Sequence, residues 1–270
     1  MKVKVRLWVK ITITIIILLI LLFIYGRYMN TTGFNVNEYT IKASIPDSFN
    51  GLKIVHISDI NYLYTTDKME LKRIIKRINL INPDIVVFTG DLLNIHINYK
   101  DEDKEDLKEL LTSINSKLGK FAINGEEDTK FDFFNDLLIN SNFIILDNSY
   151  EYIYNKTNES ILLTGISDDL KEPDIVSDCY NILLVHKPDY INEIDYENYD
   201  LILSGHSLNG YINIPGIKNL LLDKGSKKYY DTYYKLDNTN LYISSGIGTK
   251  NIKFRILNKP SINFYRINKK

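Results

Sequence analysis

The sequence contains very little cysteine and histidine, and almost no net charge. Its 270 residues include one cysteine, Cys179, and four histidines. A single cysteine excludes an intramolecular disulfide and any zinc site built from several thiolates. The 33 basic and 34 acidic side chains leave a formal net charge of −1, so the bulk attraction toward nucleic acid is missing. We therefore expect no nucleic-acid partner, and the four histidines limit the number of imidazole ligands in any metal site.

The longest apolar stretch lies at the N-terminus. Ile11–Tyr25 contains no charge, and an extension back to Leu7 crosses only Lys10. A membrane-spanning helix needs about 20 mostly apolar residues, and residues 7–25 approach that length if the Lys10 amine reaches the interface. A basic cluster precedes this run, whereas Arg27 is the only nearby charge after it. The positive-inside rule then predicts a cytoplasmic N-terminus and an extracytoplasmic main domain.

A cleaved signal peptide and a buried core helix are the alternative interpretations of this run. The residues that follow it, GRYMNTTG, offer no small-x-small cleavage site, and a run this apolar behind a basic cluster is not typical of a core helix. We predict an uncleaved, single-pass anchor that crosses the cell membrane, with the lipid bilayer as a partner through residues 7–25. The expected organisation is a basic tip and anchor (1–30), a juxtamembrane linker with an edge strand (31–50), and a main domain (51–270).

The rest of the chain alternates apolar strand-like runs with amphipathic stretches. Apolar spacing predicts a helix over residues 68–81, which Pro83 ends, a charged helix over 101–118, and a short helix over 133–139. Three consecutive antiparallel strands are expected over 143–146, 150–154 and 161–165. Further strands are predicted over 53–58, 84–89, 121–124, 181–185, 201–204, 229–236, 241–244 and 262–267. This order predicts an α/β fold with two sheets packed face to face.

Polar residues directly follow five of these apolar strands. They are Asp59, Asp91, the segment Gly125-Glu126-Glu127, His186 and His206. In α/β proteins, ligands gather at the carboxyl ends of strands, and a set of carboxylates and imidazoles suits hard or borderline divalent metal ions. An isolated Gly-Asp pair or a single histidine is usually structural. The order and spacing of the whole set therefore indicate a metal site.

The same segments resemble the motif blocks of calcineurin-like metallophosphoesterases. The family pattern is D-x-H, G-D, G-N-H-[ED], H and G-H-x-H, and the matching segments are ISDIN (57–61), FTGDLL (88–93), INGEED (123–128), LLVHKPD (183–189) and SGHSLNG (204–210). The flanking segments LDNSYEYI, LLTGISDD and YISSGIGT are similar to those of the membrane-anchored bacterial branch. The resemblance covers residues 52–267. It implies a four-layer fold, in which helices flank a two-sheet β-sandwich, and phosphoester hydrolysis with divalent metal ions.

The resemblance also implies two metal sites that share Asp91. The first would be formed by Asp59, Asn61, Asp91 and Leu208, and the second by Asp91, Glu126, His186 and His206. Asn61 and Leu208 stand where the family has histidines, and a leucine side chain has no ligand atom. Glu126 replaces an asparagine but keeps an oxygen donor. The resemblance therefore predicts a degenerate site at Asp59 and Asn61 and a better-preserved site at the other four residues.

Glu127 stands at the position that the family uses near the leaving group, where a histidine is expected. A carboxylate there removes a proton donor at neutral pH and repels an anionic phosphate. These departures favour a family member whose hydrolysis is attenuated or lost, including a non-catalytic descendant that binds a ligand. The alternative is an active enzyme that uses one manganese, zinc or iron ion on an envelope or lipid-linked phosphoester. We expect one divalent ion at most.

Overall fold

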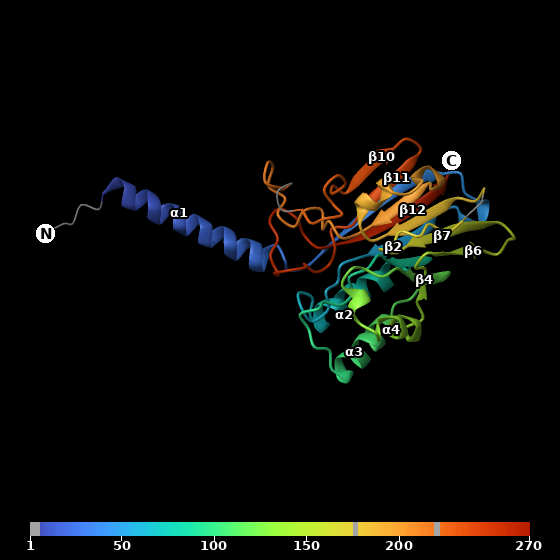
Figure 1. The fold of residues 1–270 in the computed structure, drawn as a ribbon, viewed down its shortest axis with the longest axis horizontal. Helices are drawn as coiled ribbons and strands as arrows, with labels where there is room; N and C mark the ends of the chain where they lie inside the picture. The colour runs from blue at the N-terminus through green and yellow to red at the C-terminus, as the bar shows by residue number, and fades with distance from the viewer. Residues whose placement is uncertain (1–5, 175–177, 219–221) are drawn as a thin grey trace.

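The computed structural model describes residues 6–174, 178–218 and 222–270. Helix α1 (Leu7–Ile24) continues into a π-helical turn (Tyr25–Met29) and projects away from the globular part (Figure 1). None of the α1 residues is buried. The 23 residues from Leu7 to Met29 are long and apolar enough to cross a membrane, and they contain the predicted anchor.

Two six-stranded mixed sheets form the globular part of the described ranges. The first sheet has the order β1-β12-β2-β3-β4-β5, and the second has the order β10-β11-β9-β8-β7-β6. The strands of the first sheet are β1 (Asn35–Ala43), β2 (Leu52–Ile57), β3 (Ile85–Phe88), β4 (Gly119–Ala122), β5 (Ile144–Ile145) and β12 (Ser261–Lys269). Those of the second are β6 (Ser149–Tyr154), β7 (Ser160–Ile166), β8 (Asn181–Val185), β9 (Leu201–Ser204), β10 (Tyr233–Leu236) and β11 (Thr239–Ile243).

Three helices cover the outer face of the first sheet: α2 (Lys68–Ile81), α3 (Asp101–Thr112) and α4 (Phe134–Asn140) (Figure 1). Alternate strand residues face opposite layers. Val55 and Val86 pack against the helices, whereas Ile54 and Val87 belong to the core between the two sheets, which also contains Leu184 of β8. The predicted α/β fold with two packed sheets flanked by helices is confirmed.

Three local predictions were wrong, and one of them is the strand expected over residues 229–236, which begins only at Tyr233 in β10. The strand expected at residues 143–146 is not antiparallel to its successors, because β5 pairs in parallel with β4 in the first sheet. Helix α4 forms the crossover between these two strands and returns the chain in the same direction, so antiparallel pairing begins only with β6 and β7. The charged helix ends at Thr112 instead of 118, because the Leu118 N–H donates to the Asp84 carbonyl and aligns the chain for β4.

The parallel strands bring the predicted site residues to one end of the sandwich. β2, β3 and β4 run in parallel in the first sheet, and β8 runs parallel to β9 in the second. The loops that follow β9 and β11 lie at the end of the domain next to α1 (Figure 1). The C-terminal strand β12 lies inside the first sheet, where it is parallel to β1 and antiparallel to β2.

Candidate metal centre

Three of the predicted site residues adopt a left-handed backbone directly after their strands. The φ angles are 52° at Asp59, 60° at Asp91 and 61° at His206. Residues other than glycine rarely occupy this region, and such strain is concentrated at functional sites. The loop after β4 packs closely against Asp91, because a Cβ on Gly125 would lie 2.3 Å from the Asp91 amide nitrogen.

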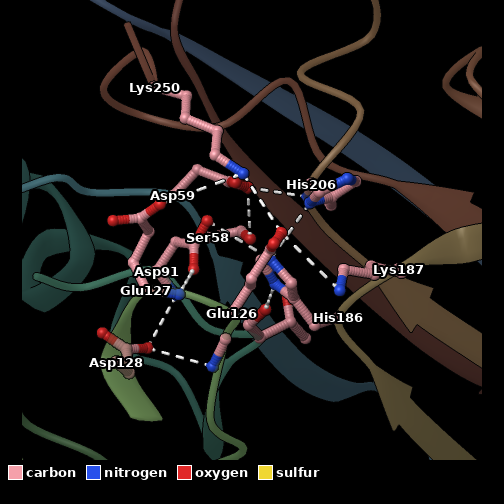
Figure 2. Close-up of polar contacts among 12 residues, drawn as sticks. Ser58, Asp59, Asp91, Glu126, Glu127, Asp128, His186, Lys187, His206 and Lys250 are labelled. Atoms are coloured by element: carbon pink, nitrogen blue, oxygen red, sulfur yellow. Dashed lines mark hydrogen bonds and ion pairs between the residues drawn. The ribbon is translucent and has the colours of Figure 1, made fainter. Parts of the chain in front are cut away.

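Asp91, His186 and His206 converge on one point. One ligand atom from each lies within 4.8 Å of the other two, and all three residues are buried. His186 Nε2 is 3.3 Å from Asp91 Oδ2 and 3.3 Å from His206 Nδ1 (Figure 2). The structure thus brings together three of the four residues predicted for the better-preserved site.

Backbone carbonyl groups orient both imidazoles. His186 Nδ1–H donates to the Thr89 carbonyl over 2.6 Å, and His206 Nε2–H donates to the Lys224 carbonyl over 2.8 Å. The opposite ring nitrogens therefore point into the cluster, where each can offer a lone pair to a metal ion once the proton on His186 is displaced, and metal-binding histidines are usually held in this way. Two imidazole nitrogens and a carboxylate oxygen suit zinc, manganese or iron. The residues present thus fit a divalent transition-metal ion.

The electrostatics of this cluster also favour a cation. Burial by itself lowers the pKa of His186, but the Asp91 and Asp59 carboxylates outweigh burial and raise it to about 10. Burial and the charge of His186 lower the pKa of His206 to about 3. The carboxylates therefore require one positive charge beside them. A divalent ion would supply that charge and displace the proton from His186.

Hydrogen bonds and apolar packing hold the residues that were predicted to form the degenerate site. Asp59 Oδ2 accepts from Ser58 Oγ over 2.6 Å and from the His206 amide over 3.0 Å. Asn61 Oδ1 accepts from Asn94 Nδ2 over 2.7 Å. Leu208 is buried and packs so closely on Gly246 that a Cβ there would lie 2.4 Å from Leu208 Cδ2. An apolar side chain is therefore packed at the residue where the family resemblance implied a metal ligand.

Lysines surround the two acidic residues of the third block. Glu126 Oε2 is 3.1 Å from Lys250 Nζ and 3.6 Å from Lys187 Nζ, and it is not part of the three-residue cluster. Glu127 Oε1 is 3.9 Å from Lys250 Nζ, and Glu127 Oε2 accepts from the Ile95 amide over 3.1 Å (Figure 2). The roles of Glu126 as a ligand and of Glu127 as a catalytic group remain predictions.

Sequence reasoning missed three residues at this site: Lys187, Lys250 and Asp128. Asp128 accepts from the amides of Asp91 (2.7 Å), Leu93 (2.9 Å) and Gly125 (3.0 Å), which ties together the loops after β3 and β4. It lies inside the INGEED block, so the block itself could have indicated it. Lys250 lies in none of the five blocks, and no local signal pairs it with Glu126, which is 124 residues away.

A cavity of about 580 Å³ opens beside the cluster. His206, Glu126, Lys187 and Lys250 contribute to its lining, together with Lys224 and Tyr190. Charged groups of both signs therefore meet at the edge of the cavity. The cavity gives a small molecule access to the side of the cluster that carries His206.

The fold and the convergence of Asp91, His186 and His206 define an α/β protein with a candidate metal site at its strand ends. Residues 52–210 match the family model described as calcineurin-like phosphoesterase. The chain therefore belongs to the calcineurin-like phosphoesterase family, as its motif blocks predicted.

Several curated relatives support this assignment over most of the chain. An uncharacterized metallophosphoesterase, YkuE of Bacillus subtilis, is 30% identical over 90% of this chain and 88% of its own length. The UDP-2,3-diacylglucosamine pyrophosphatase LpxG of Chlamydia trachomatis is 26% identical over 78% of this chain and 83% of its own. A transmembrane protein with a metallophosphoesterase domain from Danio rerio is 27% identical over 81% of this chain and 53% of its own.

Proposed function

We propose that this protein is a membrane-anchored phosphoesterase of attenuated activity that binds one divalent cation through Asp91, His186 and His206. The observation that carries this proposal is the fixed orientation of the two imidazoles by the Thr89 and Lys224 carbonyls. A buried pair of histidines facing a carboxylate needs such orientation for metal binding, whereas simple core packing does not.

The chemistry of the site explains the attenuation. A bound divalent ion lowers the pKa of a bound water and polarises a phosphoryl oxygen, and a second ion normally assists the displacement. Leu208 supplies no ligand for that second ion. The Glu127 carboxylate brings negative charge where a phosphate would approach, and Lys250 offsets part of it from 3.9 Å.

The proposed substrate is an envelope or lipid-linked phosphoester. The apolar segment Leu7–Met29 supports an anchor in the cell membrane, and the basic residues that precede it support a cytoplasmic N-terminus. The similarity to LpxG, a UDP-2,3-diacylglucosamine pyrophosphatase, supports a phosphoester that carries acyl chains. A non-catalytic, metal-dependent ligand binder is the second candidate. Asn61, Glu127 and Leu208 favour it, because they stand where hydrolysis needs metal ligands and a proton donor.

Metal content and turnover test this proposal. The full chain in detergent micelles should bind one Mn²⁺ or Zn²⁺ per molecule by calorimetry and elemental analysis. His206→Ala should weaken binding by at least roughly 10- to 100-fold, the loss caused even by removing an outer-shell partner. His96→Ala, at an exposed position, is the matched control and should bind metal normally.

The outcome separates the candidate functions. Slow, metal-dependent turnover of bis-p-nitrophenyl phosphate that disappears in His206→Ala supports the attenuated enzyme. One bound ion without turnover supports the non-catalytic binder. If the wild-type chain binds neither metal, both candidates are wrong.

A further inference from the structure

The end of the anchor packs against a loop of the globular domain. The Phe23 and Phe254 rings stack with their centroids 5.7 Å apart, and the Arg255 amide donates to the Gly26 carbonyl over 3.0 Å. A Cβ on Gly26 would lie only 2.5 Å from the Phe254 ring, so glycine is what permits this approach. Asn30 Nδ2 also donates to the Asn258 carbonyl over 3.3 Å.

Helix geometry fixes the depth of this contact in a bilayer. A helix rises about 1.5 Å per residue, so about 20 residues cross a hydrocarbon core of about 30 Å. Counted from Leu7, where α1 begins, that length ends near Gly26. Phe23 then lies in the last turn inside the lipid. Because Phe254 stacks on Phe23, it should lie at the same edge of the hydrocarbon core.

Large apolar side chains are exposed around Phe254. Ile252 and Leu257 are 57% and 59% exposed, and Ile217 is 44% exposed. The segment that carries Ile217 is joined to this loop by the bridge between Ile212 and Ile256 and by a hydrogen bond from the Asn213 amide to the Ile256 carbonyl. Large aliphatic side chains that are exposed beside an apolar helix indicate an interaction surface, because exposure of apolar surface to water costs free energy.

Basic residues lie among these exposed apolar side chains. Lys259, two residues after Leu257, is exposed. Lys250 and Lys253 flank Ile252, and their amines also pair with Glu126 and Glu70. Basic residues close to the membrane are attracted to anionic lipid headgroups, and aliphatic residues between them can enter the interfacial layer. Both the apolar and the basic residues of this surface are therefore suited to contact with an anionic bilayer.

We propose that the loop of residues 250–258, together with Ile217, is a membrane-docking surface that seats the metal-centre end of the domain on the bilayer. The inference rests on the membrane anchoring contained in the proposed function. Figure 1 shows the loops after β9 and β11 between the end of α1 and the sheets. Lys250 lines the cavity beside His206 and lies two residues before Ile252, so the docking surface and the cavity share one loop.

Depth measurements on the full chain test the docking surface. In a Cys179→Ser background, single cysteines replace Ile252, Leu257, Ile16 or Tyr154 and carry a nitroxide spin label. Each protein is reconstituted in vesicles of phosphatidylcholine and phosphatidylglycerol. Collision rates with oxygen and with a water-soluble nickel chelate then report immersion. Ile16 lies in the anchor, and Tyr154 is an exposed residue at the end of β6, distant from α1 (Figure 1).

We expect the labels at positions 252 and 257 to collide mainly with oxygen, at a depth between those at 16 and 154. If the label at 16 lies in lipid while those at 252 and 257 are as accessible to nickel as the one at 154, the docking surface is wrong and the anchor stands. If the label at 16 is accessible to nickel as well, the anchor and the docking surface are both wrong.

Discussion

At the scale of single residues, charge compensation distinguishes this metal centre. Glu126 and Glu127 add two carboxylates beside Asp91, and Lys250 lies 3.1 Å from the first and 3.9 Å from the second. Burial by itself lowers the pKa of Lys250, but Asp91 and Glu126 outweigh burial and raise it, so the amine stays charged. The Lys250 ammonium therefore repels a divalent ion that would be attracted to the same carboxylates.

Removal of this ammonium should strengthen metal binding. Lys250→Met leaves Glu126 and Glu127 without their nearest cation, and we expect the Mn²⁺ dissociation constant to fall about tenfold at low salt, because a repulsive charge disappears. Lys253→Met is the control, since Lys253 pairs with Glu70 at 2.8 Å. Calorimetry compares the two variants. Equal or weaker Mn²⁺ binding in Lys250→Met would show that the ammonium does not oppose the ion.

Restoration of the missing imidazoles should recreate the first site. The double variant Asn61→His and Leu208→His supplies two ligand atoms next to Asp59 and Asp91. We expect elemental analysis to find two Mn²⁺ ions per chain and turnover of bis-p-nitrophenyl phosphate to rise, because two ions can then clamp the phosphate. Asn61→Gln with Leu208→Met is the matched control, which adds no imidazole. One ion in both double variants would contradict the ligand assignment.

His56 should make the fold sensitive to acid. Its ring is buried between Thr89 Oγ1 (2.8 Å) and Tyr265 Oη (3.4 Å), and burial lowers its pKa to about 3. An unfolded histidine titrates near 6.5, so the unfolded state binds the extra proton as the pH falls below 6.5. Stability is therefore lost from that pH downward, by about 2 kcal/mol at pH 5.

His56→Gln isolates this effect, because glutamine does not titrate. Thermal unfolding of the full chain in micelles at pH 7.5 and pH 5.0 measures it. The wild type should lose more stability than the variant over that interval. Identical pH dependence in both proteins would mean that His56 takes up its proton equally in the folded and unfolded states.

At the scale of elements, α2 shows how local sequence signals fix a helix. The Asp67 side chain accepts from the Glu70 amide over 2.8 Å, and Asn82 ends the helix in the left-handed conformation with φ of 53°. The apolar face of α2 then packs on β2 and β3. Asp59 and Asp91 follow those strands, so packing of α2 on the sheet stabilises the strands that position the candidate metal centre.

Loss of the Asp67 cap should weaken this support. Asp67→Ala leaves a backbone amide at the start of α2 without its partner and should cost about 1 kcal/mol, or roughly 2–4 °C in Tm for a domain of this size. Asp67→Asn keeps the side-chain acceptor and serves as the control. Calorimetry compares the Tm of the two variants with that of the wild type. An unchanged Tm in Asp67→Ala would show that the cap is dispensable.

At the scale of the whole molecule, the anchor and the sandwich form one continuous unit. Tyr25–Met29 continues α1, and β1 then enters the first sheet as an edge strand beside β12. Strand pairing with β12 therefore makes much of the segment 31–50 part of the first sheet, and this segment is not merely a flexible linker between the anchor and the domain. The division at 30 and 50 remains a prediction.

Membrane orientation is the prediction at this scale. In a Cys179→Ser background, Tyr154→Cys should react with an impermeant maleimide on intact bacterial spheroplasts, and Lys4→Cys should react only after lysis, because basic residues remain on the cytoplasmic side. Ile16→Cys, within the span, should be unreactive in both cases. Labelling of position 4 but not of position 154 in intact spheroplasts would reverse the proposed orientation.

Much of this protein follows from its sequence because the signals are local. The apolar run over 7–25, the periodicity of residues 68–81 and the strands that end at the site are each encoded within a few residues. The ordered blocks gave the family and the convergence of Asp91, His186 and His206. Leu208 can be recognised as a non-ligand from its identity alone.

Only the tertiary structure decided how distant segments meet. It placed β12 inside the first sheet, β5 in parallel beside β4, Lys250 on Glu126, and Phe254 against the anchor at Phe23. These contacts join residues far apart in the chain, and side-chain packing selects them together, so no short segment carries their signature. The scarcity of histidine limits the imidazole ligands that the candidate metal centre can have, whereas the packing of Leu208 on Gly246 and the pairing of Lys250 with Glu126 depend on the tertiary structure.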